Sequence, residues 1–130
     1  MQFFYGMSNK VFETELNLID FHIIMEVKRL RKRFSYSQRG LSKKMGVTST
    51  FVGKCESLGQ PEKYNLRHLI RLKSIFNLRY LDDFFPEGFP DDKHILVRYV
   101  KTEREKLDGT LSKIREDTVI EILNITAKKK

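Results

Sequence analysis

The chain contains one cysteine and no long uninterrupted apolar run. A single cysteine excludes a disulfide within the chain and is typical of a reducing compartment. No apolar run approaches the roughly 20 residues that a membrane-spanning helix needs. The first residues also lack the basic start and apolar centre of a signal peptide. From these absences we expect a cytoplasmic protein that has no contact with a membrane.

The patterns that carry common enzyme chemistry are missing as well. The three histidines, His22, His68 and His94, are far apart, and none has the Cys/His spacing of a metal site. No glycine-rich phosphate-binding motif is present. The acidic pairs Asp82-Asp83 and Asp91-Asp92 are sequence neighbours, and neighbouring side chains on a helix do not face each other. We therefore expect no enzymatic activity, no cofactor and no metal site.

Positive charge is concentrated in one part of the chain. The 130 residues are enough for one domain with a modest core, or for a small domain with a tail. Residues 21–80 hold 14 Lys+Arg against 3 Asp+Glu, whereas the segments before and after carry a slight acidic excess. Scattered lysines would indicate only a solvated face. An excess confined to one candidate domain favours a polyanion partner.

The basic segment contains a pattern typical of two short helices joined by a tight turn. Ser37 is a good N-cap for a helix over residues 37–45, in which Leu41 and Met45 share one face. Gly46 follows where the chain must reverse, and a residue without Cβ adopts the required conformation at little cost. A second helix is predicted over residues 48–57, with Thr48 as its cap.

The second helix has an apolar face and a polar face. Val52 and Cys55 lie at i, i+3 spacing and form the inner face, which makes Cys55 a core residue and not a nucleophile. The small or polar residues left on the outer face are Ser49, Thr50, Gly53 and Lys54. They are close to a helix N-terminus, which carries partial positive charge. Such a helix can lie in the major groove of DNA.

The segment resembles the helix-turn-helix of the lambda-repressor/Cro-like (XRE) family. The residues that occupy the family's positions are Ser37-Gln38, Leu41-Ser42, Gly46-Val47-Thr48, Val52 and Glu56, and the similarity extends from Leu30-Arg31 to about Pro86. The resemblance implies a mainly α, five-helix domain over residues 19–88, bound as a homodimer to a palindromic site on double-stranded DNA. Leu58 departs from the family pattern, because it intervenes before Gly59.

The rest of the chain is assigned around this domain. Residues 1–18 are expected to be an N-terminal arm, in which the loose alternation from Val11 to Leu16 leaves a short strand as an open alternative. Helices are predicted over residues 20–33, 66–76 and 78–85 from apolar positions that recur at helical spacing. Residues 91–130 form a C-terminal appendage and a candidate dimerisation segment. Their β-branched and aromatic residues and the Asp108-Gly109 turn favour a β-hairpin, although helical readings of both halves stay open.

The resemblance also implies roles for single residues. Arg31 and Glu56 match a structural ion pair between helices, and the alternative is two exposed charges of little consequence. Gln38 matches a residue that contacts phosphate or supports a base-reading side chain, and the alternative is a solvated amide. The candidate DNA-binding residues are Gln38, Arg39, Lys43, Lys44, Thr48, Ser49, Thr50, Gly53 and Lys54.

The sequence therefore predicts a sequence-selective transcriptional regulator, for which repression is the commoner outcome with this architecture. Two alternatives stay open. One is an antitoxin, which would use the same DNA-binding fold and have a toxin protein as a second partner. The other is a protein-interaction domain that has lost DNA binding, an idea that the small outer residues Ser49 and Gly53 permit.

Overall fold

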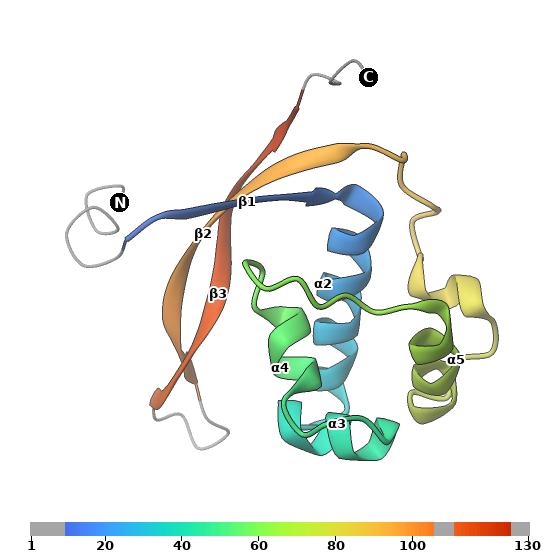
Figure 1. The fold of residues 1–130 in the computed structure, drawn as a ribbon. Coiled ribbons are helices and arrows are strands. Elements are labelled where there is room, and N and C mark those ends of the chain that lie inside the picture. The colour runs from blue at the N-terminus through green and yellow to red at the C-terminus, as the bar shows by residue number, and fades with distance from the viewer. Residues whose placement is uncertain (1–9, 106–110, 126–130) are drawn as a thin grey trace. The chain divides into compact units, whose positions relative to one another are not determined.

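The computed structural model describes residues 10–105 and 111–125. Within them the chain forms four α-helices, one 3-10 helix and three β-strands (Figure 1). The chain divides into two compact units. We call residues 17–93 the helical unit, and residues 10–16 with the described part of 94–125 the strand unit.

The expectation of a mainly α, five-helix fold is wrong, because the chain has a mixed α/β fold. Strands β1 (Phe12–Asn17), β2 (His94–Glu105) and β3 (Leu111–Asn124) form one sheet in the order β1-β2-β3. The first strand comes from the predicted arm and the other two from the predicted appendage. A short alternating segment does not form a sheet by itself, so its pairing with a distant strand was not evident in the local pattern.

Strands β2 and β3 are antiparallel, with Arg98 opposite Glu121 and an irregularity between Arg98 and Tyr99. The Arg98 guanidinium joins the three strands, since it donates to Glu13 Oε2 at 2.6 Å and to Glu121 Oε1 at 2.8 Å. Phe12 of β1 stacks on Tyr99 of β2, with ring centroids 5.5 Å apart. The predicted Asp108-Gly109 turn lies outside the described residues.

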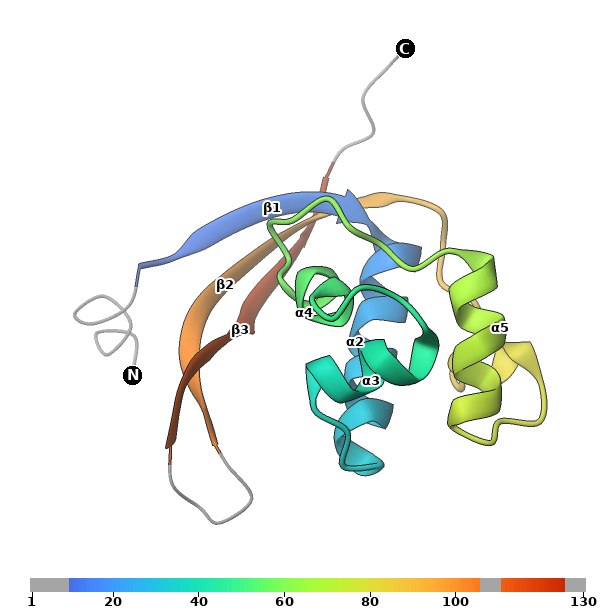
Figure 2. The same cartoon turned by 60° about the horizontal axis from the view of Figure 1, so that its bottom comes forward.

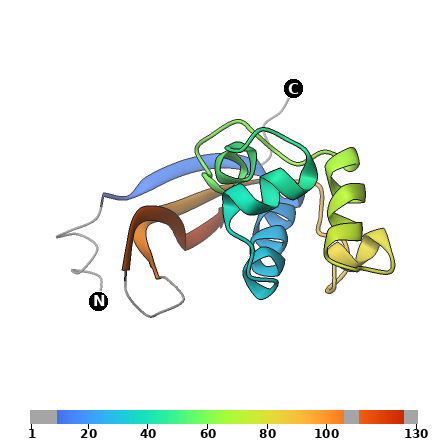
Figure 3. The same ribbon diagram turned by 90° about the horizontal axis from the view of Figure 1, so that it is seen from below.

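The helical unit consists of α2 (Leu18–Arg33), α3 (Gln38–Met45), α4 (Phe51–Glu56) and α5 (Leu66–Ile75), followed by a short 3-10 helix. Helix α4 packs against α2 and α3, and α3 also contacts α5 (Figures 2 and 3). Val27, Leu41, Val52 and Leu72, one from each helix, are completely buried. In the described residues, none of the helices combines the length and the apolar character that crossing a membrane requires.

The predicted fifth helix over residues 78–85 is reduced to a single 3-10 turn, η1 (Leu81–Phe84). Its Phe84 is completely buried, and η1 packs on α2 and α5. The Asp83 carboxylate accepts hydrogen bonds from the backbone N–H groups of Arg79, at 3.1 Å, and Tyr80, at 2.9 Å. One carboxylate therefore satisfies two donors that a longer helix would have left free at its start.

Replacing Asp83 should loosen this turn. We expect Asp83→Ala to lower the free energy of unfolding by about 1 kcal/mol, as the loss of a helix cap does. The matched control is Asp82→Ala, because Asp82 is adjacent and exposed, and we expect it to cost less than about 0.5 kcal/mol. Urea unfolding followed by circular dichroism measures both. Equal losses for the two variants would contradict a capping role for Asp83.

Candidate nucleic-acid interface

The turn between α3 and α4 is fixed by backbone conformation and by a side chain from α5. Gly46 has a φ of 77°, in the left-handed region that the sequence predicts for this position. Its N–H donates to the carbonyl of Lys43, at 3.1 Å. Arg71 of α5 donates from Nη1 to the carbonyl of Met45, at 2.7 Å. This bond satisfies a carbonyl at the end of α3 that no intrahelical N–H reaches.

Helix α4 begins at Phe51, later than the predicted start at Thr48. Residues 48–50 form a turn instead, closed by a bond from the Phe51 N–H to the Thr48 carbonyl at 3.0 Å. Neither Thr48 nor Thr50 caps the helix with its side chain. The Val52 N–H is bound by the Ser42 hydroxyl of α3, at 3.0 Å, so the neighbouring helix supplies the missing acceptor.

Ser42 holds α4 against α3 through a hydrogen bond that the sequence pattern did not predict. Its Oγ donates to the Gln38 carbonyl at 2.9 Å and accepts from Val52, and the residue is completely buried. The sequence marked it only as a family position with a small side chain. A hydroxyl three residues before Met45, on the same predicted inner face, was the available signal, because a buried hydroxyl needs a partner.

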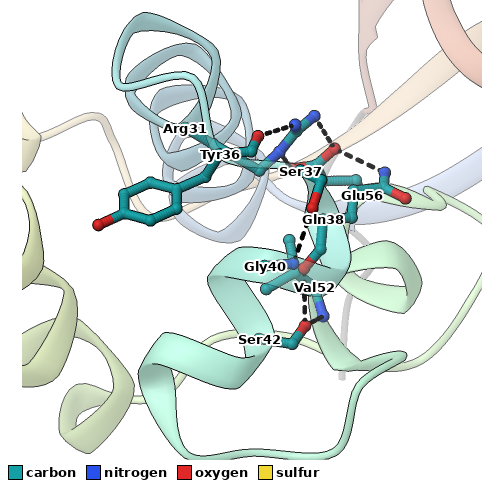
Figure 4. A network of polar contacts seen from close by, with 8 residues as sticks. All are labelled: Arg31, Tyr36, Ser37, Gln38, Gly40, Ser42, Val52 and Glu56. Carbon is teal, nitrogen blue, oxygen red and sulfur yellow. Dashed lines mark hydrogen bonds and ion pairs between the residues drawn. The ribbon is translucent and has the colours of Figure 1, made fainter.

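The ion pair expected between Arg31 and Glu56 is present and buried (Figure 4). Arg31 donates from Nε to Glu56 Oε2 at 2.7 Å and from Nη2 to Oε1 at 2.9 Å. Its Nη1 donates to the Tyr36 carbonyl at 2.9 Å, in the loop that leads into α3. Only 3% of each charged side chain is exposed. The forked guanidinium thus joins α2, the following loop and the end of α4.

Gln38 also reaches this carboxylate, because its Nε2 donates to Glu56 Oε1 at 2.9 Å (Figure 4). Its carbonyl oxygen lies against Gly53, where an added Cβ would be only 3.2 Å from Gln38 Oε1. The glycine therefore makes room for the glutamine side chain between α3 and α4. The amide is therefore not simply solvated: it supports α4 through Glu56, a role that differs from the expected contact to phosphate or to a base-reading side chain.

The remaining candidate residues are outward-facing. Thr48, Ser49 and Thr50 are exposed in the turn, Gly53 is half-buried, and Lys54 is exposed on α4. On α3, the side chains of Arg39, Lys43 and Lys44 are exposed. Arg39 donates from Nη1 to Ser49 Oγ, at 3.2 Å. The fold therefore brings Arg39 to the turn before α4, beside a residue ten positions away in the sequence.

The one thiol on the inner side of α4 is buried and protonated. Cys55 is 1% exposed, and burial raises the pKa of its thiol to about 12. Cys55 packs in the core, as its position predicts. Its thiol stays protonated there, and a protonated thiol is a poor nucleophile. Within the described chain, no group of three or more His, Cys, Asp or Glu side chains is placed to hold a metal ion.

His68 connects α4 to the start of α5. Its ring lies 4.6 Å from that of Phe51, measured between centroids. Its Nδ1 accepts from the Asn65 N–H at 3.0 Å, while the Asn65 side chain accepts from the His68 N–H at 3.0 Å. This is a reciprocal capping box, and it requires an unprotonated Nδ1. Burial, and secondarily the charges of Arg71 and Arg67, lower the pKa of His68.

Comparisons with family models, with curated proteins and with solved structures found no match for this chain.

Removing Arg31 should be costly. Arg31→Ala leaves the buried Glu56 carboxylate without its guanidinium, and we expect a loss of about 3–5 kcal/mol in the free energy of unfolding. Arg33→Ala is the control, because Arg33 is exposed on the same helix. We expect it to cost less than about 1 kcal/mol. Denaturant unfolding at pH 7 compares them. A loss in Arg31→Ala no larger than that of the control would exclude a stabilising clamp.

Stability should depend on the protonation of His68. Because its pKa is lower in the folded chain, its contribution is complete above the unfolded value of 6.5. The contribution is lost as the pH falls through 6.5 towards the lower folded pKa. His68→Gln keeps an acceptor at this capping position but does not titrate. We expect the stability difference between wild type and this variant to shrink or reverse between pH 7.5 and 5.5, in urea unfolding. A stability difference that stays constant over this pH range would contradict a lowered pKa of His68 in the folded chain.

Proposed function

We propose that this chain binds double-stranded DNA with the α3–turn–α4 segment and regulates transcription, most simply as a repressor. The observation that carries the proposal is the outward placement of Ser49, Thr50 and Lys54 on a helix pair with exposed basic residues. A short helix whose preceding turn presents small polar side chains can enter the major groove. The surrounding cations would neutralise phosphates on either side.

The rigidity of the helix pair supports the same function. The ion pair of Arg31 with Glu56, the Gln38 amide and the Ser42 hydroxyl all hold α4 in one orientation on α2 and α3. Base edges are read through short hydrogen bonds, which a loosely held helix would not place reproducibly. The polar residues that lock the pair are buried or half-buried, so they leave the outer face to the partner.

The resemblance to the XRE family supports the remaining parts of the proposal. It favours a cytoplasmic homodimer on a palindromic site, with reading helices spaced about 34 Å apart, one turn of DNA. The function is binding and not catalysis. A generic duplex titrated at low salt tests the whole proposal, and no detectable binding would exclude it.

The salt dependence of binding should identify the phosphate contacts. We expect the affinity of the wild type for duplex DNA to fall steeply with rising salt, because each neutralised phosphate releases counterions. Lys43→Ala should reduce the slope of log affinity against log salt by about one. Fluorescence anisotropy over a salt series measures this slope.

The control for this series is Arg79→Ala. Arg79 is also an exposed cation, but it precedes η1, which lies by α5 and away from α4 (Figures 1 and 2). Its loss should leave the slope unchanged. Equal changes for Arg79→Ala and Lys43→Ala would indicate a diffuse charge effect and contradict an interface on α3 and α4.

A further inference from the structure

Apart from its hydroxyl groups, the α3–turn–α4 segment offers DNA almost no acceptor side chain. In residues 37–56 only Gln38 and Glu56 carry a carboxamide or a carboxylate. Both Glu56 oxygens are bound by Arg31, and the residue is 5% exposed. Gln38 donates to the same carboxylate and lies against Gly53. The two groups that normally read adenine or cytosine are thus engaged with each other.

The free groups on the same surface are mainly donors. Arg39 uses one N–H on Ser49 Oγ, at 3.2 Å, and a guanidinium has five donors in a planar fork. Because the Ser49 oxygen accepts this bond, its own hydroxyl hydrogen is left to donate outward. Lys54, exposed on α4, adds an ammonium group. A hydroxyl can serve in either direction, but the charged groups can only donate.

The hydrogen-bonding groups that the bases present in the major groove then favour one base over the others. In the major groove guanine presents two adjacent acceptors, N7 and O6, and a bidentate arginine is their most common specific contact. Adenine presents an acceptor beside a donor, and cytosine presents a donor, so each needs an acceptor on the protein. A surface whose carboxylate is bonded to Arg31 and whose carboxamide packs between α3 and α4 is matched to guanine.

The position of Arg39 fits this task better than a contact to phosphate alone. Its guanidinium is held by Ser49, an exposed residue of the turn that precedes α4. A side chain that is tethered at one N–H loses less conformational freedom when its other donors bind a base. No described side chain tethers Lys43 or Lys44, near the end of α3, and these two cations are left to contact the DNA phosphates.

Resting on the proposed function, we infer that Arg39, oriented by Ser49, reads a guanine in each half-site of the DNA. The chain's binding sites therefore contain guanine opposite the start of α4. Arg39 determines specificity at that base pair, while Lys43 contributes affinity that is independent of sequence.

Selection from a random duplex pool with the full chain tests this inference. Wild type should recover sites with one fixed guanine per half-site. Replacing that base with 7-deazaguanine, which lacks the N7 acceptor, should weaken binding by about tenfold. In Arg39→Ala the same replacement should change affinity by less than about twofold, because its reader is gone. Arg39→Lys keeps the positive charge but lacks the planar guanidinium. It should keep its affinity for duplex DNA of any sequence, and 7-deazaguanine should weaken its binding much less than it weakens the binding of the wild type.

Lys43→Ala is the matched control. Lys43→Ala should weaken binding to every duplex, and 7-deazaguanine should weaken its binding by the same factor as in the wild type. Thermal unfolding of each variant checks that the exposed substitutions leave the fold intact. Recovered sites without a fixed guanine, or the full weakening by 7-deazaguanine in Arg39→Ala, would overturn the inference and leave DNA binding standing. Failure of the wild type to bind any duplex at low salt would instead overturn the proposed function, and the inference with it.

Discussion

The Glu56 carboxylate is the point on which the helical unit depends. Arg31 of α2 donates a hydrogen bond to each of its oxygens, and Gln38 of α3 donates a third. A buried carboxylate without these donors would be strongly unfavourable, so the three helices are held in the one arrangement that supplies them. Because α4 has only six residues, its orientation comes from these tertiary contacts and not from its own helix stability.

The same network decides what the surface presents. Ser42 and Gln38 form hydrogen bonds that hold α4 in place. Gly53 has no side chain, which leaves room for the Gln38 amide. Polar groups that would otherwise face solvent are turned inward, and the outer face keeps hydroxyls and cations. Structural locking and chemical selectivity thus have one origin, because a polar side chain engaged inside the helix pair is removed from its outer surface.

The sheet shows where local reasoning fails. β2 and β3 have the β-branched and aromatic residues that predict strands, and both are present. The short segment before α2 looked like an arm, yet it completes a three-stranded sheet with residues from the other end of the chain. Glu13 and Glu121 meet on Arg98. No periodicity within either segment encodes that meeting, since a strand becomes stable only with its neighbours.

Local chemistry by itself determined the cap at Ser37, the left-handed Gly46, the buried face of Val52 and Cys55, and the basic character of the segment. These follow from φ/ψ limits, side-chain hydrogen bonding and helical period, which act over a few residues. The tertiary structure alone decided that α4 starts at Phe51, that η1 is a single turn, and that Arg39 meets Ser49. Those outcomes depend on donors and acceptors contributed by distant elements, and their partners exist only once the chain has folded.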